Sequence, residues 1–185
     1  HGNTTSLSSP VQVGSLSDWS IVSGQNHMMA IKTDGTLWGW GENGGGRIGD
    51  GTEIDKSSPV QIGSQTDWAS IATSPYGSTI AIKTSGKMYS WGRGAGGVLG
   101  HGNTTNYSSP VQVGSLTNWG SRVSTSNNFS SAIKTDYTVW AWGVNSTGQL
   151  GQGNTTDTSS PVQVGSLTDW STVSSGHRHI AGLKT

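Results

Sequence analysis

The chain has no cysteine and few charged residues. Without cysteine it can form neither a disulfide framework nor a thiolate metal site. Only 11% of its 185 residues are charged, and ten basic side chains balance ten acidic ones. No net charge therefore attracts the chain to nucleic acid or to an anionic membrane surface. We expect no nucleic-acid partner.

Long apolar runs and helical periodicity are absent as well. The longest apolar runs span only a few residues, which argues against a membrane-spanning helix, so we expect no membrane insertion. No window repeats apolar residues at the 3.6-residue period of a helix. Glycine is abundant instead, with 29 residues. Together these features predict an all-β protein rich in turns.

One motif recurs four times, about fifty residues apart. A Ser-Ser-Pro-Val-Gln segment is followed by a tryptophan, then by Ile-Lys-Thr or Leu-Lys-Thr, and in three copies by Trp-Gly. A period of this length is typical of stacked or radial repeats, in which one unit is too small to bury its own apolar face. Positions locked to a repeat are packing positions, so we expect these tryptophans to wedge between units. They are Trp19, Trp68, Trp119 and Trp170 after the proline segment, and Trp40, Trp91 and Trp142 before glycine.

Four short strands are expected within each copy. In the first copy they cover 19–23, 28–32, 36–40 and the region near 59–62. Asp34-Gly35, between the second and third strands, is a strong hairpin signal. A proline at the start of the fourth strand suits an outer edge, where a missing N–H donor matters least. Four antiparallel strands in a radially repeated unit describe a β-propeller blade.

The segment 142–151 carries a family resemblance. It reads Trp-Gly-x-Asn-x-x-Gly-Gln-Leu-Gly and closely resembles the repeat of the regulator of chromosome condensation family. Copy one keeps the Trp-Gly-x-Asn part at 40–43, whereas copy two has Arg93-Gly94 in place of x-Asn. The resemblance implies an all-β propeller arc of about four blades with four-stranded antiparallel sheets, within a larger ring that commonly has seven blades. It says less about function, because such propellers serve as exchange factors, enzyme inhibitors, adhesins and virion parts.

We expect a single repeat domain over residues 1–185. Its parts are the outer strand of one blade at 1–14, three blades at 15–63, 64–114 and 115–165, and a partial blade at 166–185. The chain starts at His1, and copy four stops before a Trp-Gly strand. The expectation is therefore a piece of a longer polypeptide, with assembly of several copies as the alternative.

Only the loop between the first and second strands varies in length. From the first tryptophan to the lysine of the Lys-Thr pair the spacing is 13, 15, 15 and 14 residues, whereas the later spacings stay at 8 and 19. Equivalent loops fall at one end of a propeller, and loops on a rigid scaffold often carry binding residues. Neutral drift at an unconstrained turn explains the variation equally well. The candidate partner-binding residues are Gln25, Asn26, His27, Tyr76, Asn127, Asn128, Phe129, His177, Arg178 and His179.

No catalytic, cofactor or metal site is expected. The glycine-rich run 41–47 precedes a strand, whereas a phosphate loop needs a following helix. No serine stands in a nucleophile arrangement with a histidine and an acid. His177 and His179 form the only local histidine pair, and a zinc site needs at least one more ligand.

The composition predicts a non-enzymatic binding or structural module. The low charge and the abundant Ser, Thr and Asn favour an extracellular microbial protein or a phage virion surface protein that takes part in attachment or assembly. Such a module would bind a protein or a glycan through one propeller face. Two alternatives stay open: a eukaryotic-type regulator of a small GTPase or of chromatin, which is the family's founding role, and an inhibitor of a secreted enzyme.

Overall fold

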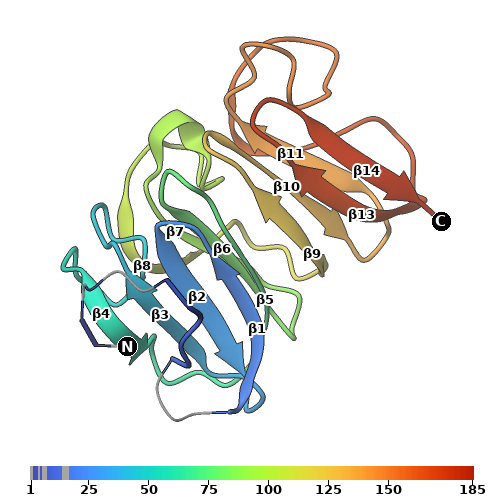
Figure 1. Ribbon diagram of the computed structural model, residues 1–185. Coiled ribbons are helices and arrows are strands. Elements are labelled where there is room, and N and C mark those ends of the chain that lie inside the picture. Colours follow the sequence, from blue (N-terminus) through green and yellow to red (C-terminus); the bar gives the residue numbers. More distant parts are fainter. Residues whose placement is uncertain (1, 4, 6–7, 14–16) are drawn as a thin grey trace.

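The chain folds into antiparallel sheets that stand side by side in sequence order (Figure 1). A computed structural model describes every residue except 1, 4, 6–7 and 14–16. The first sheet contains β1 (Trp19–Gly24), β2 (His27–Lys32), β3 (Leu37–Gly41) and β4 (Lys56–Gln61). The second contains β5 (Trp68–Thr73), β6 (Ser78–Lys83), β7 (Met88–Gly92) and β8 (Tyr107–Gln112). The third contains β9 (Trp119–Thr125), β10 (Phe129–Lys134), β11 (Val139–Gly143) and β12 (Thr158–Gln163), and a two-stranded sheet pairs β13 (Trp170–Ser175) with β14 (Ile180–Lys184).

Each four-stranded sheet is a meander in chain order, with its first strand on the inside of the arc. The first strands β1, β5, β9 and β13 contact one another in succession, whereas β4, β8 and β12 are the outer strands, each paired with one strand only. The predicted all-β blade architecture is therefore confirmed. Within the described residues the only helix is a 3-10 turn, η1 (Ala95–Gly97), and no helix is long and apolar enough to cross a membrane.

The outer strand differs from its prediction in one respect. β4 begins at Lys56, so Pro59 lies inside the strand instead of at its start. The pairing of β3 with β4 shifts register between Gly39↔Val60 and Gly41↔Lys56. The proline thus occupies a bulge on an edge strand, where its missing N–H breaks no ladder hydrogen bond. The outer strand predicted at 1–14 lies partly outside the described residues, and those of its residues that are described form no strand.

The cores lie between neighbouring sheets, and the repeat tryptophans fill them. Trp68 belongs to a buried cluster with Met29 and Leu37 of the first sheet, and Trp119 to one with Ile82 of the second. The wedge role predicted for these tryptophans is confirmed where a preceding sheet is present.

The Trp-Gly tryptophans lie against glycines of the preceding blade. Trp91 and Trp142 have no exposed surface. A Cβ atom placed on Gly49 would lie 2.5 Å from the indole nitrogen of Trp91, and one on Gly100 would lie 2.9 Å from that of Trp142. Because real Cβ atoms do not approach so closely, only glycine lets the indole reach this depth.

A lysine near the end of each second strand packs against aromatic rings. The Lys83 Nζ lies 4.9 Å from the ring centre of Trp68 and 2.9 Å from an Asp67 carboxylate oxygen. In the third blade the Lys134 Nζ lies 3.4 Å from the ring centre of Trp140, but Asn118 occupies the position of the aspartate. Burial lowers the pKa of Lys134, and Asp136 partly offsets that effect.

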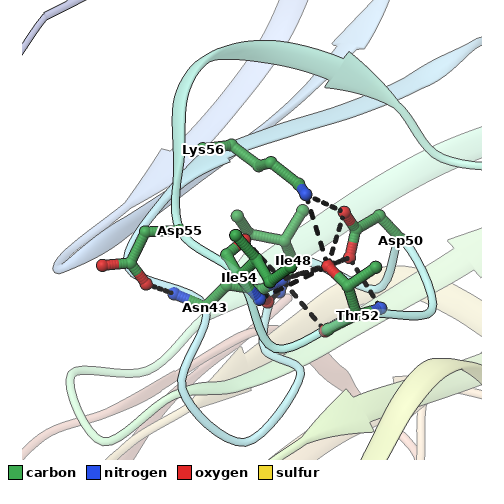
Figure 2. Close-up of polar contacts among 7 residues, drawn as sticks. All are labelled: Asn43, Ile48, Asp50, Thr52, Ile54, Asp55 and Lys56. Carbon is green, nitrogen blue, oxygen red and sulfur yellow. Dashed lines mark hydrogen bonds and ion pairs between the residues drawn. The ribbon is translucent and has the colours of Figure 1, made fainter.

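The motif asparagine organises the long connector between the third and fourth strands (Figure 2). Asn43 is fully buried, and its side-chain oxygen accepts a hydrogen bond from the Ile48 backbone N–H at 2.9 Å. Its amide donates to the backbone oxygens of Thr52 and Ile54, and its own backbone N–H donates to Asp55 at 2.7 Å. Asn145 repeats this role in the third blade. The asparagine of the repeat motif is therefore a structural residue.

Uncharged hydrogen bonds join the blades along the inner strands. The Ser23 and Thr73 hydroxyls of β1 and β5 lie 3.0 Å apart, and the Ser70 hydroxyl donates to the Ser121 carbonyl of β9 at 2.8 Å. The Ser175 backbone N–H of β13 donates to the Ser124 hydroxyl at 2.9 Å. These bonds fix the relative positions of the inner strands and therefore of the loops that follow them.

Candidate functional site

The four loops between first and second strands meet at one end of the arc. They cover 25–26, 74–77, 126–128 and 176–179. Each is closed by a backbone hydrogen bond across its base, such as Gln25 N–H to the His27 carbonyl at 2.9 Å and Gly176 N–H to the His179 carbonyl at 2.8 Å. We call their joint surface, with the adjacent Arg93, the loop face.

A hollow of about 320 Å³ in the loop face is lined by residues from all four loops or from the strand ends beside them. Its lining offers hydroxyl, amide and imidazole groups and no carboxylate. The hydroxyl of Ser126 is buried and without a hydrogen-bond partner. The lining residues are Gln25, Thr73, Pro75, Thr125, Ser126, Asn127, Ser175, Gly176 and His177.

A second hollow of about 210 Å³ lies beside the first, between the second and third blades. Tyr76 and Arg93 line one part of it, and Asn127 and Asn128 line another. Asn127 belongs to both hollows and donates a hydrogen bond from its amide to the Nδ1 of His177 at 3.2 Å. The two hollows therefore adjoin at Asn127, and the second of them also has apolar lining from Tyr76, Ala95 and Val98.

Most of the predicted residues are accessible on this surface. Tyr76 is 54% exposed, and Asn127 is half-buried. The exposed members are Gln25, Asn26, Tyr76, Asn128, His177, Arg178 and His179. These residues stay candidates for partner contact.

His27 and Phe129 do not reach the surface, and their place among the candidates was wrong. They are 0% and 1% exposed, because each is the first residue of a second strand and points into the core. The Thr79 hydroxyl donates to the Arg47 carbonyl at 2.9 Å, so it accepts from the His27 Nε2 at 2.8 Å. Burial, with a contribution from the Arg47 charge, lowers the pKa of His27 to about 4. His27 is thus a neutral core residue at physiological pH.

Arg93 is a functional candidate that the sequence pattern did not single out. It stands at the variable position of the Trp-Gly-x-Asn motif, is exposed, and lines the second hollow beside Tyr76. The departure of copy two from the motif, at Arg93-Gly94, was the available signal.

Basic side chains outnumber acidic ones on the loop face. Its four loops contain no aspartate or glutamate and carry Arg178. The nearby carboxylate of Glu42 is bound to the buried Arg47 guanidinium at 2.9 Å. No ion pair is found for Arg93 or Arg178 among the described residues. Among the residues that the structure describes, no three His, Asp or Glu side chains lie close enough together to hold a metal ion.

Models of the regulator of chromosome condensation (RCC1) repeat match most of the chain. One matches residues 34–80, 85–133 and 137–183, and a second RCC1 model matches 20–47. The ultraviolet-B receptor UVR8 of Arabidopsis thaliana is 33% identical over 163 residues, which cover 86% of this chain and 37% of the receptor. This chain therefore spans little more than a third of that relative.

Solved structures share the fold. Human WBSCR16 superimposes with a TM-score of 0.82 at 22% identity, over 99% of this chain and 49% of its own. Prp20p from Saccharomyces cerevisiae superimposes with a TM-score of 0.75 at 22% identity, over 92% of this chain and 45% of its own. Prp20p is described as a protein that binds Gsp1p and histones.

These relatives overturn the predicted role and location. Curated relatives come from Arabidopsis thaliana, Homo sapiens, Mus musculus and Danio rerio, and the name of one places it in mitochondria. The prediction of an extracellular microbial or virion surface protein for attachment was therefore wrong, and the eukaryotic regulator is the better interpretation. The prediction was misled by the low content of charged residues. That content is a property of the repeat itself and carries no information about where the protein is located. The glycan partner has no support among these relatives.

Proposed function

The chain belongs to the RCC1 repeat family, and from that membership we propose that it is a regulatory module that binds a protein partner through the loop face. The partner class we assign is a small GTPase, by analogy with the family's founding role. The propeller acts in this proposal by binding and by stabilising one state of its partner, without catalytic side chains of its own. The convergence of four loops on one continuous surface carries the proposal.

The loop face has the composition of a protein contact surface. Tyr76, Arg93 and Arg178 are the kinds of side chain that dominate binding energy in protein interfaces, and small polar residues surround them. The loops are also held in place before binding. In loop 74–77 the Gly77 N–H donates to the Ser74 carbonyl at 3.2 Å, and the Ser78 N–H donates to the Ser74 hydroxyl at 3.0 Å. A surface that is already ordered loses little conformational entropy on binding.

The charge of the loop face favours a GTPase over histones. Arg93 and Arg178 are not neutralised by an ion pair in the described structure, and the loops hold no acid. A basic face repels the basic tails of histones and attracts an acidic patch on a partner. Because Prp20p binds both Gsp1p and histones, both are suitable probes.

Binding measurements on immobilised chain test the proposal. Nucleotide-free small GTPases, Gsp1p included, and core histones are the analytes. We expect a GTPase to bind and the Tyr76→Ala, Arg93→Ala and Arg178→Ala triple variant to bind at least about tenfold more weakly, with an unchanged unfolding midpoint. Lys87→Ala, in the β6–β7 turn at the opposite end, is the matched control. Equal weakening by the control, or binding of histones alone, would refute the proposal.

A further inference from the structure

The inner strand of the third blade contains one residue more than the inner strands of the other sheets. In β1 the pairs Trp19↔Lys32 and Val22↔Ala30 enclose two residues, 20–21, and β5 and β13 have the same spacing between the equivalent pairs. In β9 the pairs Trp119↔Lys134 and Val123↔Ala132 enclose three residues, 120–122. Part of the length variation that the sequence assigns to the loop therefore lies in the strand, as an enlarged β-bulge.

The enlarged bulge holds Arg122, which faces the inside of the arc. β9 packs between β5 and β13, and one of its edges pairs with β10. An exposed side chain in the middle of this strand can point only to the side that is left, the inside of the arc. Arg122 is exposed, and no ion pair is found for it in the part of the chain that the structure describes. Bulges often re-aim a side chain at functional sites.

We call the inward surface of β1, β5, β9 and β13 the inner wall. Arg122 is the one charged residue in these four strands. The other exposed polar groups on them are hydroxyls, those of Ser20, Ser121 and Ser174. The inner wall therefore presents one unpaired cation among neutral hydrogen-bonding groups, without a carboxylate of its own.

A second departure in the same blade shifts its charge in the same direction. Asn118, just before β9, stands where the other three blades have an aspartate. In those blades the aspartate forms an ion pair with the lysine of the repeat. The third blade alone has thus lost a negative charge before its inner strand and gained a positive charge within it.

We propose that the inner wall at β9 binds an acidic protein segment in extended conformation, with a carboxylate of that segment on the Arg122 guanidinium. A guanidinium matches a carboxylate with two parallel hydrogen bonds. Each inner strand is the end strand of its sheet, so backbone groups on its inward edge are available to an extended chain.

The inner wall also has an entrance on the loop face. Thr73, Thr125 and Ser175 are the last residues of β5, β9 and β13, and all three line the hollow of about 320 Å³. From Thr125 the strand reaches Arg122 in three residues, or about 10 Å. An extended segment that enters at this hollow can therefore reach the guanidinium directly.

Protection of a strand edge is a different use for the same features, because bulges and charges on edge strands prevent unwanted strand pairing. β1, β5 and β13 also end their sheets, yet they contain no charged residue. The arc therefore does not need a charge on each such edge, and anchoring of an anionic group accounts for the single arginine.

A fluorescein-labelled polyglutamate of about eight residues, long enough to follow the seven residues of β9, is the probe. Titrated with the full chain at low ionic strength, it should show a saturable rise in anisotropy, and polyglutamine of equal length should not. Bound polyglutamate should slow amide hydrogen exchange in 119–125.

Two variants of equal net charge provide the matched comparison. Arg122→Gln should bind polyglutamate at least about tenfold more weakly, because the charge-assisted bonds are lost. Lys87→Gln, at the end of the arc opposite the loop face, should bind it as the unmodified chain does. Equal weakening by the two variants would overturn the proposal, as would tighter binding of an oligothymidylate of the same length. Unchanged binding by Arg122→Gln together with self-association in light scattering would assign the arginine to edge protection.

The inner wall and the loop face are tested by different variants. Loss of polyglutamate binding in the double variant Arg93→Gln and Arg178→Gln, with full binding by Arg122→Gln, would place the acidic segment on the loop face and overturn this proposal. The peptide can bind through Arg122 even if no small GTPase binds the chain, and the reverse, so failure of one proposal is distinguishable from failure of the other.

Discussion

Tyr137 is the one described residue other than glycine with a positive φ, at 62°. It lies in the β10–β11 turn, where the other two complete blades have Gly35 and Gly86. A side chain in the left-handed region is strained by about 1–2 kcal/mol. Tyr137 is 56% exposed, so its ring contributes little burial in return.

Tyr137→Gly should therefore stabilise the chain by about 0.5–1 kcal/mol, after the greater flexibility of glycine in the unfolded state is subtracted. Urea unfolding at neutral pH measures this gain. Tyr137→Ala retains the strain and should show none. Gly35→Ala should destabilise, because its Cβ would collide with the Thr66 carbonyl oxygen. A gain from Tyr137→Ala equal to that from glycine would disprove the strain argument.

Asn118 stands where the other blades have an aspartate, so the buried Lys134 lacks the ion-pair partner of its equivalents. In the other blades the carboxylates of Asp18 and Asp67 lie 3.4 and 2.9 Å from the corresponding Nζ. Asn118→Asp should add about 1 kcal/mol of stability at pH 7, since a direct charge pair is added to a buried cation that Asp136 only partly compensates. In a double-mutant cycle with Lys134→Met that gain should vanish. If it persists there, the aspartate acts through something other than the lysine.

The burial of His27 and Phe129 was predictable from the sequence, although length variation obscured it. Both stand five residues before the lysine of the repeat, as Ser78 and His179 do, and in the three complete blades this position is buried, whereas His179 beside the two-stranded sheet is exposed. Positions with a constant offset from a packing residue are packing positions themselves, the argument that placed the tryptophans correctly. Counting loop length from the tryptophan instead assigns these strand residues to the loop.

The connector after the third strand shows how one motif builds two structures. In the first and third blades a buried asparagine holds it, whereas the second blade has Gly94, whose N–H donates to the Asn106 side chain at 3.0 Å. A 3-10 turn, η1, follows Gly94 directly. The turn itself is kept, because the Gly97 N–H donates to the Gly94 carbonyl as the Gly46 N–H does to that of Asn43. What changes is that the Thr105 carbonyl lies where an asparagine side chain would begin.

Asn43→Ala should destabilise by roughly 2–3 kcal/mol, because it leaves buried backbone groups of the connector without partners. Replacing a residue by the one found in the other repeats usually stabilises a repeat protein, but restoring the motif asparagine in the second blade should not. Gly94→Asn should also destabilise, since its Cβ would collide with the Thr105 carbonyl oxygen. Thermal unfolding compares both variants with the unmodified chain, and stabilisation by Gly94→Asn would contradict the expected collision with the Thr105 carbonyl.

At the scale of the whole molecule, His27 makes stability depend on pH. Its pKa of about 4 in the folded chain lies below the ordinary histidine value of 6.5, so the unfolded chain takes up a proton first. Stability is complete above pH 6.5 and falls as the pH drops toward 4, with a loss of roughly 2 kcal/mol at pH 5. His27→Phe, which copies Phe129 of the third blade, should flatten this part of the urea-unfolding profile. An unchanged slope between pH 7 and 5 in that variant would assign the loss to other groups.

The overall architecture was predictable because repetition reports packing four times over, whereas the function was not. The proposed loop face consists of residues that differ between copies, such as Tyr76 and Arg93, and a single chain shows their difference without showing its reason. Comparison with relatives supplied the family.

The distribution of charge along the arc has a consequence for its behaviour in salt. Every ion pair in the described part of the chain joins two residues of the same blade, for example Asp67 with Lys83. The contacts between blades include apolar rings and neutral hydroxyl bonds such as Ser23 with Thr73, and no ion pair crosses between blades in the described residues. Mobile ions screen charges and leave such contacts unaffected. We therefore expect cohesion between blades to change little with ionic strength, whereas the attraction that we propose between the loop face and an acidic partner should weaken. Salt should then release a partner from an intact scaffold.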